Sequence, residues 1–157
     1  MSIIIEGVDG IGKTTKALKM INDWPKFKYV HNWVKPKKAL EIQSEANKEL
    51  LLAEYGKHII FDRSYIISEY VYANVLGRET SILLYMVQDF VNLLAERDSY
   101  ICFMLSTNIS GLILDDCDKT LPIQELNNYY HDLFTNKLRV PKDCLDIIEV
   151  RQVGEKG

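Results

Sequence analysis

The chain has 157 residues, of which 47% are hydrophobic and 26% are charged, and these are the proportions of one ordinary globular domain. Its net charge of −3 at pH 7 does not favour a nucleic-acid partner, because nucleic-acid-binding proteins usually present a basic face. No stretch approaches the roughly 18 apolar residues that span a bilayer, and the N-terminus has the pattern of a core strand rather than a leader. We therefore expect a single cytoplasmic domain over residues 1–157, without a membrane partner.

Apolar runs alternate with stretches of helical period along the whole chain, which is typical of α/β proteins. The predicted strands are Ile3–Glu6, Lys28–Trp33, His58–Asp62, Ser99–Ser106 and Leu145–Val150. The predicted helices are Lys13–Asn22, Lys37–Tyr55, Tyr65–Leu76, Thr80–Glu96 and Pro122–Leu138. Because the strands are continuously apolar rather than alternating, helices should cover both faces of the sheet. We expect a doubly wound parallel sheet of about five strands flanked by helices.

The first strand and the first helix are joined by Gly7–Thr14, which read G-V-D-G-I-G-K-T and match the phosphate-binding loop pattern G-x-x-x-x-G-K-S/T. Glycines let backbone N–H groups approach phosphate oxygens, and the positive end of the following helix points at the same anion. Lys13 would reach the β- and γ-phosphates, and the Thr14 hydroxyl would bind Mg²⁺. The alternative is a glycine-rich turn without a ligand. The motif indicates a P-loop NTPase that binds the nucleotide through Gly7, Asp9, Gly10, Ile11, Gly12, Lys13, Thr14 and Thr15.

In a sheet of this kind, ligands bind beyond the carboxyl ends of the strands. The third predicted strand ends in Asp62 and Arg63, so both residues should lie at the same edge as the loop. Asp62 can hold Mg²⁺ or accept a hydroxyl proton, and Arg63 can clamp a second phosphate with two hydrogen bonds. The alternative is a structural Asp–Arg pair that caps the next helix.

Three cysteines, Cys102, Cys117 and Cys144, are widely spaced and include no C-x-x-C pair. This pattern argues against a disulfide framework and against a zinc site. Cys102 lies in an apolar run, and we expect it to be a small core residue.

Two stretches of the chain resemble a known family of P-loop kinases. Residues Ile5–Thr15 look like the start of thymidylate kinases, and Phe61–Ser64 look like their D-R motif or the E-R-S motif of the related deoxynucleoside kinases. The order of elements agrees over nearly the whole chain, whereas motif-level agreement is confined to these two stretches. The compact length and the run Ser68–Tyr72 are similar to the versions carried by bacteriophages.

The resemblance implies a kinase that uses ATP and Mg²⁺ and transfers the γ-phosphoryl group to a deoxynucleoside monophosphate, as thymidylate kinases do. It implies catalytic roles for Lys13, Asp62 and Arg63, and metal binding by Thr14 and Asp62. Asp9 corresponds to the carboxylate near the 3′-hydroxyl of the acceptor sugar. The implied acceptor contacts are Asp9, Trp33, Arg63, Tyr70 and Arg78.

The sequence departs from the family pattern in three places. After the second strand, Val30–Pro36 contains neither the Arg of thymidylate kinases nor the catalytic Glu of deoxynucleoside kinases, and Lys35 offers only a point charge. The lid-like segment Thr107–Leu121 contains no arginine, although such lids normally supply one. Ser68 lies one residue further from Asp62 than the family spacing.

These departures leave two alternatives to the monophosphate kinase. One is a deoxynucleoside kinase, whose acceptor is an uncharged hydroxyl and requires fewer arginines. The other is a nucleotide-binding module with little catalytic activity. A GTPase is not indicated, because Asn136–Arg139 lacks the final Asp of the N-K-x-D base-reading motif. The helices Tyr65–Leu76 and Thr80–Glu96 carry wide apolar stripes that fit either a homodimer or a buried core.

Overall fold

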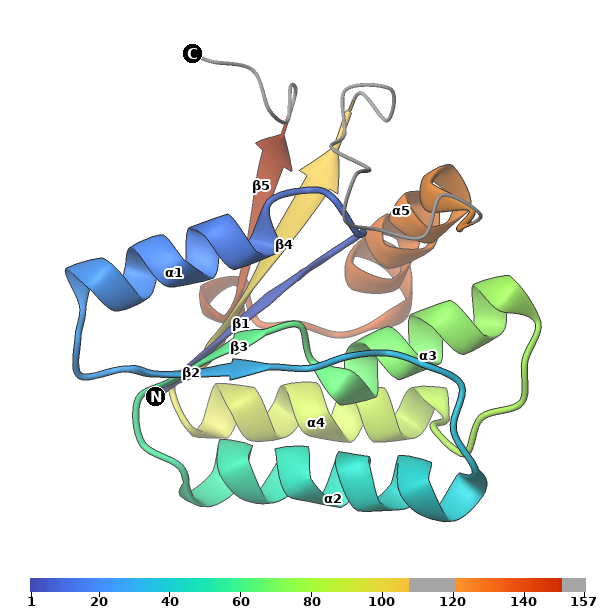
Figure 1. Cartoon of the computed structure of the whole chain (residues 1–157), viewed down its shortest axis with the longest axis horizontal. Helices are drawn as coiled ribbons and strands as arrows, with labels where there is room; N and C mark the ends of the chain where they lie inside the picture. The colour runs from blue at the N-terminus through green and yellow to red at the C-terminus, as the bar shows by residue number, and fades with distance from the viewer. Residues whose placement is uncertain (108–120, 151–157) are drawn as a thin grey trace.

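A five-stranded parallel sheet forms the centre of the structure, with the strand order β2-β3-β1-β4-β5 (Figure 1). This computed structural model describes residues 1–107 and 121–150. Every neighbouring pair of strands is parallel, which confirms the predicted doubly wound α/β class. The strands are β1 (Ser2–Gly7), β2 (Lys28–His31), β3 (Ile59–Asp62), β4 (Tyr100–Ser106) and β5 (Leu145–Val150).

Helices cover both sides of this sheet. α1 lies on one side, whereas α2, α3 and α4 lie on the other, with α5 packed beside α3 (Figure 1). A π-helix over Leu133–Lys137 follows α5, and a 3₁₀ turn over Lys142–Cys144 precedes β5. The α-helices are α1 (Lys13–Asp23), α2 (Ala39–Tyr55), α3 (Tyr65–Leu76), α4 (Leu84–Glu96) and α5 (Ile123–Asp132).

Two predicted helices differ from the structure by more than two residues, whereas the other helices and the strands agree with it to within two residues, including the strand predicted over Lys28–Trp33, which ends at His31. The helix predicted over Thr80–Glu96 begins only at Leu84. Upstream, Thr80 Oγ1 accepts a hydrogen bond of 3.2 Å from the Ile82 amide, and such a local side-chain bond competes with helix formation. The helix predicted over Pro122–Leu138 is divided between α5 and the π-helix.

Apolar side chains on the central strands form the core between the sheet and the helices. All six residues of β1 are buried, as expected for a strand that is covered on both faces. Cys102 is a buried free thiol, as predicted, and Cys144 is also buried. Cys117 and most of the predicted lid-like segment lie outside the described residues. Within the described ranges, no helix is both long enough and apolar enough to cross a membrane.

The register of the sheet brings the ends of β1, β3 and β4 to one edge. Ile5 is paired with Asp62, and Gly7 is paired with Met104. Gly7 has a φ of +143°, and a Cβ atom there would lie 2.7 Å from the Met104 carbonyl oxygen. Only glycine fits this close approach. The loop that follows β1 therefore starts from a fixed position against β4.

Phe103→Ala should destabilise the fold by about 3–5 kcal/mol, because a fully buried aromatic ring is replaced by a cavity. Phe103 is 0% exposed, and its ring centroid lies 5.0 Å from that of Phe134 and 5.9 Å from that of Tyr130. Urea denaturation measures the free energy of unfolding. The control is Leu51→Ala on α2, where the side chain is 58% exposed and the change should stay within about 0.5 kcal/mol. Equal losses in the two variants would contradict this account of the core.

Candidate functional site

The loop between β1 and α1 is anchored by buried apolar side chains and turned by left-handed glycines. Val8 and Ile11 are 0% and 1% exposed, whereas Gly10 and Gly12 have φ values of +77° and +100°. Among the described residues, no side chain caps the N-terminus of α1. The first amides of the helix have no partner inside the helix itself, so they can receive an anion at the positive end of the helix dipole.

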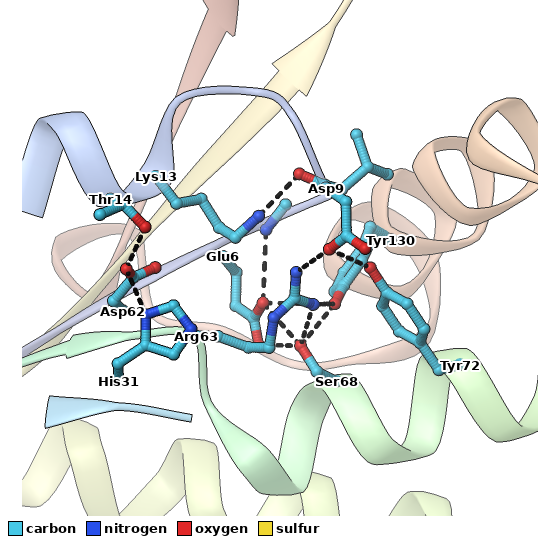
Figure 2. A network of polar contacts seen from close by, with 12 residues as sticks. Glu6, Asp9, Lys13, Thr14, His31, Asp62, Arg63, Ser68, Tyr72 and Tyr130 are labelled. Atoms are coloured by element: carbon cyan, nitrogen blue, oxygen red, sulfur yellow. Dashed lines mark hydrogen bonds and ion pairs between the residues drawn. The ribbon is translucent and has the colours of Figure 1, made fainter. Parts of the chain in front are cut away.

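Lys13 lies folded back across this loop (Figure 2). Its Nζ donates a hydrogen bond of 2.6 Å to the Val8 carbonyl oxygen, and the side chain is buried. Burial, together with repulsion from Arg63, lowers the pKa of Lys13 to about 7. Thr14 and Thr15 follow it on the first turn of α1 and are exposed. A cation and two hydroxyl groups therefore lie where the loop would hold an anion.

Three side chains contact one oxygen of Asp62, at the end of β3, and Figure 2 shows two of these contacts, those of Thr14 and His31. Thr14 Oγ1 donates to Oδ2 at 2.5 Å, and Tyr29 OH donates to it at 2.6 Å. His31 Nδ1 lies 2.9 Å from the same oxygen. The other oxygen, Oδ1, is buried and has no hydrogen-bond partner among the described residues. The structure thus brings together Thr14 and Asp62, the two predicted metal ligands.

Sequence reasoning did not single out Tyr29 and His31. Both lie on β2, which pairs with β3 so that His31 is opposite Asp62. Residues two apart on a strand point to the same face, so both side chains reach the carboxylate. The sequence offered one signal for these residues, namely two polar side chains at alternate positions of a short strand. Only the register of β2 against β3 shows that they meet Asp62.

Arg63 is the centre of a second network on the other side of the loop (Figure 2). Its φ of +78° is left-handed, which is uncommon for a residue other than glycine. Nη2 pairs with Asp9 Oδ1 at 2.5 Å, and Nη1 donates to Ser68 Oγ at 3.1 Å and to Tyr130 OH at 3.2 Å. Tyr72 OH also donates to Asp9, at 3.0 Å. Arg63 and Asp9, both predicted site residues, therefore form an ion pair.

Glu6 is buried directly beneath this network. It is 0% exposed and accepts hydrogen bonds from Ser68 Oγ at 2.8 Å and from the Ser64 amide at 3.2 Å. Burial raises the pKa of Glu6, against the opposing charge of Arg63. Ser68, whose distance from Asp62 departs from the family spacing, has a structural role here. Its hydroxyl accepts a hydrogen bond from Arg63 and donates one to Glu6.

The alternative of a structural Asp62–Arg63 pair that caps α3 is wrong. The two side chains belong to separate networks, and the N-cap of α3 is Ser64, whose Oγ accepts a hydrogen bond of 3.1 Å from the Ile67 amide. Asp62 and Arg63 therefore do not cap α3, and their side chains face the loop side of the sheet edge.

Glu49 on α2 completes the support of α3. This carboxylate accepts hydrogen bonds from Ser64 Oγ at 3.0 Å, from the Tyr65 amide at 2.8 Å and from the Ile66 amide at 2.7 Å. Burial nevertheless raises its pKa to about 8. Sequence reasoning missed this residue, because an acidic residue on a helix gives no signal of the partner that buries it.

The remaining predicted acceptor contacts are distributed over two regions. Trp33 is 67% exposed, and its ring centroid lies 4.3 Å from that of His31, beside the Asp62 network. Tyr70 is buried against α5, and Arg78 pairs with Glu69 at 2.7 Å. Within the described part of the chain, neither Tyr70 nor Arg78 forms a hydrogen bond or an ion pair with the loop between β1 and α1.

The donor set around Asp62 fits Mg²⁺ better than it fits a transition metal. Asp62 Oδ1 and the Thr14 hydroxyl are hard oxygen donors, and Mg²⁺ typically keeps several waters and takes only one or two carboxylates from the protein. The described residues contain no group of three or more His, Cys, Asp or Glu side chains that could hold an ion by themselves. A metal held here would therefore be shared with water and with a bound phosphate.

The chain matches no protein-family model and none of the curated proteins. Its structure is similar to the crystal structure of the YorR protein from Bacillus subtilis in complex with phosphorylated GDP, with a TM-score of 0.69 and 16% sequence identity. The similarity covers 96% of this chain and 85% of that chain. At this identity the likeness establishes the fold alone, a parallel α/β sheet covered by helices on both sides.

Glu49→Gln should remove a pH dependence of stability. The folded-state pKa of about 8 lies above the ordinary value of 4.5, so the folded chain binds this proton more tightly than the unfolded chain does. The contribution is complete below the ordinary pKa and is lost as the pH rises through about 8, so the free energy of unfolding should fall between about pH 5 and pH 8. Urea denaturation at several pH values measures this slope.

The control for this prediction is Glu41→Gln, an exposed position on the same helix, which should keep the slope of the wild type. An unchanged slope in Glu49→Gln would show that this carboxylate does not hold its proton in the folded state.

Proposed function

We propose that this protein is an ATP- and Mg²⁺-dependent kinase that transfers the γ-phosphoryl group to a deoxynucleoside monophosphate, in the manner of thymidylate kinases. The observation that carries the proposal is the meeting of Thr14 with Asp62 beside Lys13, at the mouth of a phosphate-binding loop. An ion pair of Asp9 with Arg63 lies next to it. The nucleotide in the YorR complex, phosphorylated GDP, supports a nucleotide as the ligand of this fold.

The loop and its flanking residues would hold the donor nucleotide. The amides at the start of α1 and the Lys13 ammonium would bind the phosphates, and Thr14 and Asp62 would hold the metal. When bound, Mg²⁺ neutralises charge on the phosphates. Lys13 exchanges the Val8 carbonyl for a phosphate oxygen, a stronger acceptor because it is charged.

The residues around Arg63 would hold the acceptor. Asp9 is 27% exposed and lies at the mouth of the loop, where it can receive a hydrogen bond from an acceptor hydroxyl. Arg63 would face the acceptor phosphate. The exposed ring of Trp33 lies beside the Asp62 network instead, so it is not among the acceptor contacts of this proposal. Catalysis would then come from alignment of the two substrates and from charge stabilisation, without a covalent intermediate.

A deoxynucleoside kinase is the second candidate, and one observation favours it. The Arg63 guanidinium is already engaged by Asp9, Ser68 and Tyr130. An acceptor phosphate would have to compete with Asp9 for this cation, whereas an uncharged hydroxyl could bind Asp9 and leave the ion pair in place.

The proposal is tested by measuring ADP formation from Mg·ATP against a panel of deoxynucleosides and their monophosphates. Turnover is expected with a monophosphate and should be lost in Lys13→Ala, because that variant lacks the cation of the loop. Thermal unfolding with and without ATP shows whether Lys13→Ala remains folded and no longer binds. Turnover with free nucleosides alone would establish the second candidate. ATP binding without turnover across the panel would instead indicate a nucleotide-binding module.

Asp62→Asn should lower turnover by at least about a hundredfold while ATP binding is retained, because the amide neither accepts a proton nor neutralises a cation. Single-turnover kinetics and ATP titrations measure the two effects separately. Asp23→Asn, an exposed position at the end of α1, controls for the loss of a negative charge. Full activity of Asp62→Asn would remove Asp62 from the mechanism.

A further inference from the structure

The two carboxylate oxygens of Asp62 have very different surroundings. Oδ2 receives Thr14 Oγ1, Tyr29 OH and His31 Nδ1, at 2.5, 2.6 and 2.9 Å. Oδ1 receives no hydrogen bond from any described residue, although the Asp62 side chain is only 1% exposed. A buried carboxylate oxygen without a donor is uncommon, and it points to a ligand that the protein itself does not supply.

The three donors fix the rotation of the carboxylate. In the tautomer of His31 that carries its hydrogen on Nδ1, all three groups donate to Asp62 Oδ2. Tyr29 has one hydroxyl hydrogen, which is also directed at Asp62. Because Thr14 belongs to α1 and the other two donors belong to β2, the carboxylate is held from two separate elements. Turning Oδ2 away from them would break three hydrogen bonds at once.

The ring of His31 is itself held in place. It is packed against Trp33 with 4.3 Å between ring centroids, and its Nδ1 lies 3.1 Å from Tyr29 OH. Its side chain is only 28% exposed. The Nδ1 atom of His31 therefore lies in a partly buried cluster with Tyr29 and Trp33.

We propose that Tyr29 and His31 are positioning residues that make Asp62 a one-oxygen metal ligand, and that they thereby favour Mg²⁺ over Ca²⁺. Mg²⁺ requires near-octahedral geometry and takes few carboxylate oxygens, whereas Ca²⁺ accepts six to eight oxygens and often binds both oxygens of one carboxylate. With Oδ2 occupied by three donors, Asp62 can offer Oδ1 alone. The inference rests on the proposed function, because the metal would enter together with the nucleotide.

The test compares binding of a non-hydrolysable ATP analogue, with an imido bridge between the β- and γ-phosphorus atoms, in Mg²⁺, in Ca²⁺ and without metal. Isothermal titration calorimetry gives the three affinities, and the readout is the ratio of the Mg²⁺ affinity to the Ca²⁺ affinity. In the wild type this ratio should exceed one. In Tyr29→Phe/His31→Leu it should fall about tenfold, the usual scale for removing residues that orient a metal ligand, while metal-free binding is unchanged.

Two further variants separate positioning from a general structural effect. Tyr55→Phe/His131→Leu makes the same chemical changes at exposed positions and should keep the wild-type ratio. His31→Asn keeps an N–H group as many bonds from Cβ as Nδ1 is, so with Tyr29 unchanged this variant should retain most of the preference for Mg²⁺.

The outcomes distinguish this inference from the proposed function. An unchanged ratio in Tyr29→Phe/His31→Leu would overturn the inference and leave the proposed function intact. Loss of metal-free binding in that variant, with an unchanged ratio, would likewise overturn it, since Tyr29 and His31 would then only support the fold. If the wild type did not bind the analogue under any of the three conditions, the proposed function would fail, and the inference would fail with it.

Discussion

The buried guanidinium of Arg63 is the constraint on which the site depends. Its side chain is 7% exposed, and taking such a charge out of water costs on the order of several kcal/mol unless partners surround it. Those partners come from the loop after β1, from α3 and from α5, through Asp9, Ser68 and Tyr130. Satisfying one cation therefore fixes the loop, the helix that follows β3 and the helix that precedes β5 relative to one another.

The turn at Arg63 also separates two kinds of chemistry. Asp62 and Arg63 are adjacent in the chain, yet the left-handed φ of +78° at Arg63 sends their side chains into different networks. Such a conformation costs roughly 1–3 kcal/mol, and it persists only where the surroundings over-determine it. Here the Arg63 amide donates to the Ile5 carbonyl at 2.9 Å, so the strain is held by the neighbouring strand. On the proposed function, this turn divides a metal side from an acceptor side.

Sequence reasoning recovered the elements that follow from local pattern and missed what depends on pairing between distant segments. Continuous apolar runs located β1, β3 and β4 to within one residue, and Tyr65–Leu76 was predicted with the bounds of α3. Tyr29 and Glu49 were missed, because neither shows locally that it will meet Asp62 or the start of α3. The role of Tyr29 depends on the register of β2 against β3, which cannot be read from the sequence of either strand alone.

On the proposed function, the position of Lys13 lets one loop be stable both without and with a phosphate. The ammonium group donates to the Val8 carbonyl at 2.6 Å, so it has a partner within the loop when no anion is present. Unpaired, a buried ammonium would carry a large desolvation cost. A bound phosphate would replace that carbonyl with a charged acceptor, and the exchange requires movement of a side chain rather than of the backbone. The glycine turns and the buried Val8 and Ile11 side chains can then keep the same arrangement in both states, which makes nucleotide binding compatible with a loop anchored in the core.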